Sequence, residues 1–302
     1  MCLIKIDNFI KAMRDGDIHF SSLYNEYRVK EVKRDIQYID DNDFNHRLDI
    51  FLPEENNKVI IFNIHGGGYC YGYKEQSNVY CSYFANRGFE VVSMNYTLMN
   101  KDKEMSIETQ ITEVISSIYF VIKNKEKFSL KFEKIVLMGD SAGGHIAMMV
   151  ALALRNPKLR NQYGNFKENI NIDKLILSSP MYDYSRIVSI AKIALNKNGL
   201  MTLFSKNYKN KRLLKRNSPK YYLDLGFVIP ESLLIYSKKD VFSFQSKELI
   251  RDFKKNKRTI DIYFEEDKKC NHVFHHFSLD KETSIRANEY IIKFILNQIS
   301  IK

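Results

Sequence analysis

Apolar residues along the chain follow two different periodicities, and the way these alternate predicts the fold class. Short apolar runs rich in β-branched residues recur, each with the length of a buried strand. We expect strands at 59–64, 89–95, 135–138, 174–179, 233–237 and 260–264. Between them the apolar residues recur at helical spacing, at 78–86, 106–123, 147–154, 246–255 and 280–299. Strands that alternate with helices predict an α/β fold, with a mostly parallel central sheet and helices on both faces.

The two segments that depart from this alternation are the N-terminal part and a stretch in the second half. Residues 1 to about 35 have amphipathic helical spacing, and 35–53 alternates as two strands joined by a turn. Residues 184–217 are less regular. No internal repeat or low-complexity linker divides the 302 residues. We therefore expect one domain, with a small cap contributed by about 1–40 and 184–217.

The composition fits a globular protein and narrows its partners. Hydrophobic residues make up 44% of the chain, and 47 Lys and Arg against 36 Asp and Glu give a net charge of +11. Such a charge suits nucleic acid or an anionic membrane, but no nucleic-acid-binding motif accompanies it. No apolar run approaches the roughly 18 residues of a membrane span, and the first residues lack a signal-peptide core. We expect a soluble cytoplasmic protein with reduced thiols, and the sequence leaves the oligomeric state open, a homodimer included.

The most informative motif is Gly139-Asp140-Ser141-Ala142-Gly143, which lies between an expected strand and an expected helix. A sharp strand-to-helix turn crowds side chains, so glycine is favoured on both sides of its apex. Ser141 at that apex would be exposed to a substrate carbonyl. The following helix would offer unpaired N–H groups and the positive end of its dipole. A tight turn without chemistry remains the alternative for this motif alone.

A second glycine cluster, His65-Gly66-Gly67-Gly68, also follows an expected strand. Successive glycines let the backbone approach a ligand and present bare N–H groups, which an oxyanion hole requires. The cluster is not a phosphate loop, because no Gly-Lys-Ser/Thr follows, and Tyr71 interrupts a dinucleotide-binding pattern. Two such turns at strand ends predict acyl transfer from an ester or an amide.

A serine nucleophile needs a base, and the base needs an orienting acid, which in this architecture follow in the order serine, acid, histidine. Asp240 comes three residues after the strand that ends at Ser237. Its rival is Asp183, which follows another strand but has the residue type that also serves turns and loops. Chain order and strand position favour Asp240 as the acid.

Three histidines follow the last expected strand, and a loop position favours His272 as the base. His275 and His276 are expected to begin or flank the closing helix. His272 and His276 are four residues apart, but no carboxylate with a clear ligand role is near, so we expect no metal site. His65 is expected to brace the glycine loop, and His145 to be a helix residue.

With these residues in place, the chain resembles the hormone-sensitive-lipase-like esterases of the α/β-hydrolase superfamily. The resemblance rests on H-G-G-G-x-x-x-G at 65–72 and G-D-S-A-G-G at 139–144, and it follows the family order from about 59 to 299. It implies an α/β-hydrolase fold with a helical cap over an acyl pocket, and no cofactor. It also implies a serine esterase acting on a small-molecule ester, with an amide or formamide hydrolase and a non-catalytic binding protein as alternatives. The implied triad and oxyanion hole are Ser141, Asp240 and His272, with the N–H groups of Gly67, Gly68 and Ala142.

Two loops depart from the family pattern. Thr97-Leu98-Met99-Asn100 replaces Arg-Leu-Ala-Pro, and Val241-Phe242-Ser243-Phe244 replaces the usual proline and second acid after Asp240. We expect both loops to line the pocket and to affect substrate preference. Aromatic rings near the glycine loop and after the acid should narrow the pocket and favour short acyl chains; they are Tyr69, Tyr71, Tyr73, Phe242 and Phe244. The basic run at 206–216 is expected to be a solvated face of the cap rather than an anion site.

Overall fold

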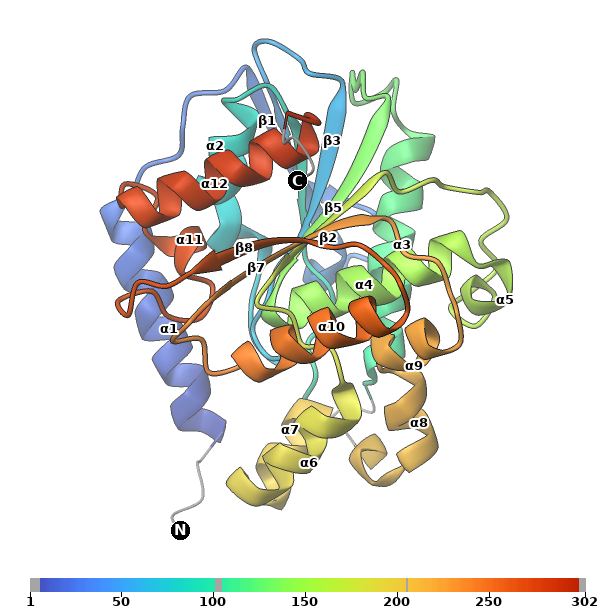
Figure 1. The fold of residues 1–302 in the computed structure, drawn as a ribbon. Helices are drawn as coiled ribbons and strands as arrows, with labels where there is room; N and C mark the ends of the chain where they lie inside the picture. The colour runs from blue at the N-terminus through green and yellow to red at the C-terminus, as the bar shows by residue number, and fades with distance from the viewer. Residues whose placement is uncertain (1–5, 101–104, 205, 299–302) are drawn as a thin grey trace.

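The computed structural model describes residues 6–100, 105–204 and 206–298, and a single twisted sheet runs through its centre (Figure 1). Within these residues eight strands have the order β1-β2-β4-β3-β5-β6-β7-β8. β1 pairs antiparallel with β2 and β2 antiparallel with β4, whereas all later neighbours are parallel. The strands are β1 (Glu31–Gln37), β2 (Arg47–Leu52), β3 (Val59–Ile64), β4 (Glu90–Met94), β5 (Lys134–Asp140), β6 (Lys174–Ser178), β7 (Glu231–Ser237) and β8 (Asp261–Glu265).

Helices cover both faces of the sheet, and a group of short helices projects from one end of it (Figure 1). α3 and α4 pack on one face, while α2 and α12 pack on the other. The helices are α1 (Ile6–Leu23), α2 (Asn78–Ala85), α3 (Ile107–Lys123), α4 (Ser141–Arg155), α5 (Pro157–Arg160), α6 (Tyr184–Ala194), α7 (Lys197–Phe204), α8 (Lys211–Arg216), α9 (Pro219–Asp224), α10 (Ser243–Lys255), α11 (Phe274–Phe277) and α12 (Glu282–Ile295). Single 3₁₀ turns occur at η1 (Phe44–His46), η2 (Lys74–Ser77) and η3 (Lys206–Lys209).

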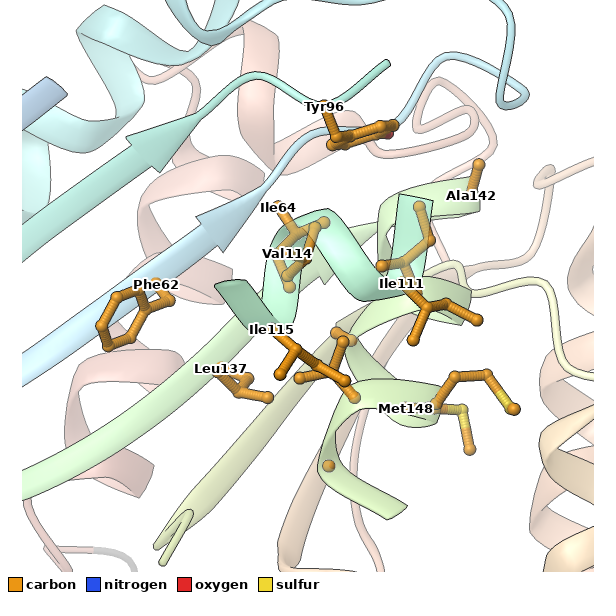
Figure 2. Packing of buried hydrophobic residues seen from close by; sticks show 14 of the residues in the cluster. Phe62, Ile64, Tyr96, Ile111, Val114, Ile115, Leu137, Ala142 and Met148 are labelled. Atoms are coloured by element: carbon orange, nitrogen blue, oxygen red, sulfur yellow. The ribbon is translucent and has the colours of Figure 1, made fainter. Parts of the chain in front are cut away.

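Alternation along the central strands divides the core between the two faces of the sheet. In β3, Phe62 and Ile64 belong to the cluster under α3 and α4, whereas Ile61 belongs to the cluster under α2 and α12. Figure 2 shows Phe62 and Leu137 of neighbouring strands near Ile115 of α3. Because both faces of β3 are covered by helices, its apolar residues are not restricted to every second position of the sequence.

The predicted α/β fold with a mostly parallel sheet is confirmed, and most element positions are close to those expected. The prediction fails near the N-terminus, where the expected helix from 1 to about 35 ends at Leu23 in the described residues. Residues Glu31–Gln37 form β1, whose register with β2 shifts between Lys33 and Ile36. The few apolar residues of β1 continue the helical spacing of the residues before them. Only the pairing of this segment with β2 distinguishes it as a strand. Residues 1–5 lie outside the described part.

The predicted cap segment of about 1–40 therefore includes one strand of the sheet, so only α1 remains from it as a candidate cap element. The segment 184–217 is less irregular than its sequence suggests, because it forms α6, α7, η3 and α8. A capping role for these helices stays a prediction. No described helix has the length and apolar character needed to cross a membrane.

Candidate active site

The turn from Gly139 to Gly143 joins β5 directly to α4 and carries Ser141 at its apex. Ser141 has φ = 50°, in the left-handed region that non-glycine residues seldom adopt. A Cβ at Gly143 would lie 2.1 Å from the carbonyl oxygen of Ile64, so a larger residue would collide with the end of β3. The turn is thus compressed against the sheet, and Ser141 keeps 7% of its surface exposed at the edge where the parallel strands end.

The glycine loop after β3 packs against this turn. Gly67 has φ = 107°, and a Cβ there would lie 2.0 Å from the carbonyl oxygen of Tyr71. The Gly66 N–H donates to Asp140 Oδ1 over 2.9 Å, which joins the two glycine motifs. Burial raises the pKa of Asp140 to about 6, against the opposing effects of His272 and of the Gly66 N–H. Asp140 is therefore a buried linker between the loop and the turn.

Asp240 and His272 form a pair beside this turn. His272 Nδ1 lies 2.8 Å from Asp240 Oδ1, which also accepts the backbone N–H of Phe242 over 2.8 Å. Asp240 lies in the loop between β7 and α10 and is 3% exposed. Burial alone would raise the pKa of Asp240, but the hydrogen bond and charge of His272 hold it below its ordinary value. Among the described residues, His272 Nε2 is buried without a hydrogen-bond partner, so the second ring nitrogen is available to a reacting group.

A cavity of about 260 Å³ joins the serine turn, the glycine loop and the histidine loop. Ser141 and His272 both line it, together with Gly67 and Gly68. Its walls therefore carry a hydroxyl, a carboxylate-paired imidazole and a glycine backbone. Such a set has the composition required for nucleophilic attack on a carbonyl.

The other candidates have different environments. Asp183 caps α6 by accepting the N–H of Arg186 over 3.1 Å, as its loop interpretation predicted. His65 bonds through Nδ1 to the Gly66 carbonyl oxygen over 2.8 Å, and its ring stacks on Tyr96. His145, in α4, approaches the carbonyl oxygen of residue 217 with Nε2 over 2.6 Å. Burial lowers the pKa of His65 and of His145 to about 4, so both are neutral.

His275 is buried in α11, where its Nε2 lies 2.8 Å from Ser178 Oγ and its Nδ1 3.1 Å from Tyr80 Oη. The ring of His276 packs on Tyr80 with centroids 3.6 Å apart. Both precede α12, as expected, and burial lowers the pKa of His275 to about 4. Neither approaches Asp240, which pairs with His272 instead.

The aromatic residues expected around the pocket are only partly there. Tyr71 and Phe242 line the cavity, but Tyr69 is buried against His145, and Tyr73 and Phe244 line other hollows. The backbone is left-handed at Gly67, Gly68, Tyr69 and Gly72. The tyrosine side chains of this loop therefore point in different directions, which their spacing in the sequence does not reveal. The sequence prediction also missed two wall residues from the N-terminal helix, Met13 and Asp17.

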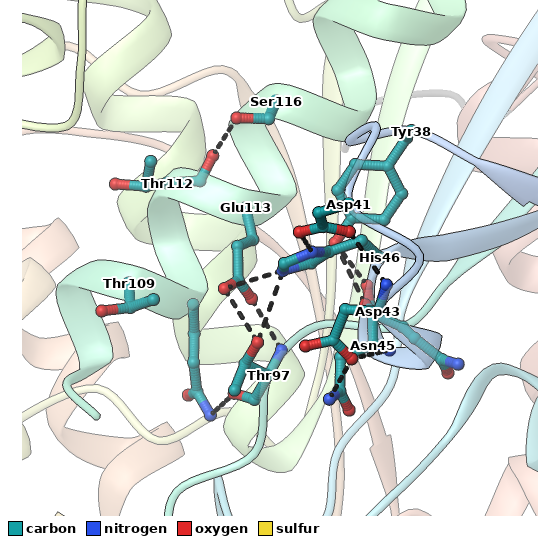
Figure 3. Close-up of polar contacts among 12 residues, drawn as sticks. Tyr38, Asp41, Asp43, Asn45, His46, Thr97, Thr109, Thr112, Glu113 and Ser116 are labelled. Atoms are coloured by element: carbon teal, nitrogen blue, oxygen red, sulfur yellow. Dashed lines mark hydrogen bonds and ion pairs between the residues drawn. The ribbon is translucent and has the colours of Figure 1, made fainter. Parts of the chain in front are cut away.

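Residues 97–100, after β4, pack against the glycine loop and are not among the described residues that line the cavity. Glu113 of α3 accepts the Thr97 N–H over 2.6 Å and the Thr97 hydroxyl over 2.9 Å, and its Oε1 lies 3.1 Å from His46 Nε2 (Figure 3). The N–H of Met99 then donates to the carbonyl oxygen of Tyr69 over 2.8 Å. The expectation that 97–100 lines the pocket is therefore wrong, whereas Val241 and Phe242 do line it.

Comparison with known proteins assigns the chain to a family. The family model BD-FAE matches residues 48–252. The chain belongs to the BD-FAE family. Within this BD-FAE chain, 141 residues are 30% identical to isoprenylcysteine alpha-carbonyl methylesterase ICME of Arabidopsis thaliana, covering 46% of the chain and 32% of that protein. A further 27% identity over 112 residues links it to an acetyl esterase of Salmonella schwarzengrund (strain CVM19633), covering 37% and 34% of the two chains. The matches thus span about a third of each relative.

Solved structures extend the likeness to nearly the whole BD-FAE chain. Esterase B from Lactobacillus rhamnosis, in a structure with a tributyrin phosphonate, has a TM-score of 0.85 and 22% identity, covering 96% of this chain and 92% of its own. A truncated carbohydrate esterase from gut microbiota has a TM-score of 0.70 at 20% identity, covering 89% and 98%. At such identities the agreement concerns the fold. The expected membership of the α/β-hydrolase superfamily, with its sheet and flanking helices, is confirmed.

Proposed function

We propose that this protein is a serine carboxylesterase that hydrolyses small esters through an acyl-enzyme. The observation that carries the proposal is one cavity whose wall holds Ser141 on a strained turn and His272 paired with the buried Asp240. The relatives named methylesterase and acetyl esterase support the same class of reaction.

In this mechanism His272 Nε2 takes the Ser141 hydroxyl proton while Oγ forms a bond to the ester carbonyl carbon. The tetrahedral intermediate collapses, its bond to the alkoxy oxygen breaks, and the alcohol leaves with the proton from His272. Water then attacks the acyl-enzyme and gives its proton to His272, which returns it to Ser141 as the acid leaves. Asp240 holds the imidazole tautomer and stabilises the imidazolium.

The N–H groups of Gly67, Gly68 and Ala142 are the proposed oxyanion hole. Gly67 and Gly68 lie outside any helix or strand, and Ala142 is in the first turn of α4, where N–H groups lack helical partners. Donors of this kind act on the charge that develops in the transition state, and one of them is typically worth about 10²–10³ in kcat.

We infer a preference for short acyl chains, of roughly two to six carbons, from the balance between burial and overpacking. Tyr71, Phe242 and Met13 bound a cavity of about 260 Å³. Each methylene buried there adds about 0.8 kcal/mol until the space is filled, after which further carbons force the walls apart.

The test has two arms. A fluorophosphonate probe should label the native protein at Ser141 and leave Ser141→Ala unlabelled, and a native protein without label would contradict the esterase proposal. With nitrophenyl esters from acetate to palmitate, kcat/KM should peak at two to six carbons, a range set by the same packing argument. A maximum at long chains, or a jump in rate above the solubility limit, would indicate a lipase. Faster turnover of matched anilides than of esters would favour an amide hydrolase.

A further inference from the structure

A second cavity, of about 220 Å³, adjoins the one that contains Ser141. The proposed ester hydrolysis gives it no role. Both cavities share the wall residues Asp17, Gln76, His276 and Phe277. In Figure 1, α1 lies alongside α11, which brings residues from the two ends of the chain together at this wall. Asp17 therefore lines both the cavity with Ser141 and the one beside it.

Asp17 is a half-buried carboxylate in α1 without a cationic partner. The hydroxyl of Tyr71 and the side-chain amide of Gln76 both donate to its Oδ2. Within the part of the chain that the structure describes, no lysine or arginine forms an ion pair with Asp17. Its two donors fix the direction of the carboxylate, and neither of them carries a positive charge.

Glu75 adds a second carboxylate to the wall of this cavity. Its Oε1 accepts from Lys74 Nζ over 2.5 Å, and its Oε2 has no partner in the described residues. Lys74 is shared with Asp35 and Asp49, each 2.9 Å from the same nitrogen. Asp49 also pairs with Arg34 over 3.2 Å, and Arg34 is shared with Glu26, so two cations face four carboxylates and the neighbourhood of Glu75 stays negative.

The rest of the lining is aromatic or apolar and includes neither lysine nor arginine. It consists of Tyr24, Tyr73, Val79, Tyr80, His276, Phe277 and Leu279 with Gln76. One cation lies within electrostatic range: burial raises the pKa of Tyr71 and of Tyr73, and the charge of exposed Arg14 opposes both rises. The chain carries a net charge of +11, so two carboxylates in one cavity give this cavity a charge opposite to that of the whole protein.

Carboxylates together with the faces of aromatic rings form the surroundings that an ammonium group prefers in proteins. We propose that the second cavity binds a cationic group, so that the preferred substrates are esters that carry an alkylammonium a few bonds from the scissile carbonyl. Asp17 is the specificity-determining residue, because it stands at the boundary of the two cavities. This inference rests on the proposed esterase function.

The experiment compares isosteric esters that differ only in nitrogen against carbon. Choline acetate, here the ester acetylcholine, is paired with 3,3-dimethylbutyl acetate, which places the cation on the alcohol side. Ethyl 4-(trimethylammonio)butanoate is paired with ethyl 5,5-dimethylhexanoate, which places the cation on the acyl side. At pH 8 we expect one pair to show at least a tenfold higher kcat/KM for the cation, which corresponds to about 1.4 kcal/mol. In Asp17→Asn, which keeps both hydrogen bonds but loses the charge, that ratio should fall to within about threefold of one, as expected when a charged partner becomes neutral.

Asp15→Asn is the matched control, because it removes the same charge from an exposed position of the same helix and should leave the ratio unchanged. Ratios near one in the native protein, an unchanged ratio in Asp17→Asn, or faster hydrolysis of glycerol monoacetate than of choline acetate would each overturn the proposal. If the native protein hydrolyses none of these esters, the esterase function itself fails. Calorimetric binding of choline acetate and 3,3-dimethylbutyl acetate to Ser141→Ala still decides the cation preference: tighter binding of choline acetate supports it, and equal or weaker binding overturns it.

Discussion

Replacing Asp240 by asparagine removes one negative charge from a side chain that is 3% exposed and 2.8 Å from His272 Nδ1. Asparagine has the same shape, so the loop between β7 and α10 keeps its packing. The carboxylate supplies two things that the amide does not: charge opposite the imidazolium, and an acceptor on whichever oxygen faces His272. The substitution therefore tests the orienting role of Asp240 rather than the fold.

The expected magnitude has two parts. A hydrogen bond to a charged partner is worth about 1.5–3 kcal/mol against about 1 for a neutral one, so loss of charge alone lowers kcat about tenfold. If the amide NH₂ faces His272, the imidazole adopts the wrong tautomer, and the total loss approaches about 10⁴-fold, or roughly 5.5 kcal/mol. Asp240 Oδ1 also accepts the Phe242 N–H, so an amide oxygen in that place would keep both hydrogen bonds and give the smaller loss, whereas an amide NH₂ there would lose both.

The assay is kcat and kcat/KM on nitrophenyl butyrate, beside a thermal melt that checks folding. Asp183→Asn is the matched control, since Asp183 caps α6 and asparagine caps a helix about as well, within roughly 0.5 kcal/mol. We expect Asp240→Asn to lose between about tenfold, for the missing charge, and about 10⁴-fold, for a misoriented base, and the control to keep native rates. A variant at Asp240 with native rates, or a larger loss at Asp183, would refute the assignment of the acid.

Three further predictions follow from the same geometry. Ser141→Ala should retain at most about 10⁻⁴ of native esterase activity with an unchanged melt, as nucleophile deletions do, and turnover of a few per cent would contradict its role. His272→Ala should be equally inactive, whereas His275→Ala and His276→Ala should keep most activity per folded molecule. His275→Ala should also lose about 2–4 kcal/mol of unfolding free energy, because it leaves buried partners unpaired. An active His272→Ala beside an inactive His275→Ala would mean that the base is misassigned. Burial raises the pKa of Asp140 from its ordinary 3.8 to about 6, so between these two pH values the folded protein keeps a proton that the unfolded chain has released. Its charge thus costs stability above pH 6, and Asp140→Asn should raise the unfolding free energy at pH 8 by about 2–3 kcal/mol while the gain disappears near pH 4, as urea titrations at both pH values would show.

The sequence predicts the centre of this molecule well because local and global preferences agree there. Residues 59–64 are apolar except for Asn63, which suits a strand covered on both faces, and β3 has those bounds. Ser106 precedes a regular apolar stripe, and it caps α3 by accepting the Thr109 N–H over 3.3 Å. The glycines of the two motifs are likewise explained by close backbone contacts, such as Gly143 against Ile64. In each of these cases a short window of sequence contains the cause of the structure.

The failures concern contacts between segments distant in sequence. Val32 and Ile36 lie among charged residues, and Glu31–Gln37 becomes a strand only because β2 offers an edge to pair with. Asp17 appears as one polar position of an amphipathic helix, and nothing near it in the sequence indicates that Tyr71 and Gln76 will meet it. Local periodicity identifies such a helix but does not say where it docks.

The two loops that depart from the family pattern consequently have different meanings. Thr97 is bound by Glu113, and Met99 donates its N–H to the carbonyl oxygen of Tyr69, so residues 97–100 act on the shape of the glycine loop and are absent from the described cavity wall. Phe242, in contrast, lies on the cavity wall with its ring 5.2 Å from that of His272. Changes in the first loop should therefore alter rates for all esters together, through the oxyanion donors, while changes in the second should alter the choice among acyl groups.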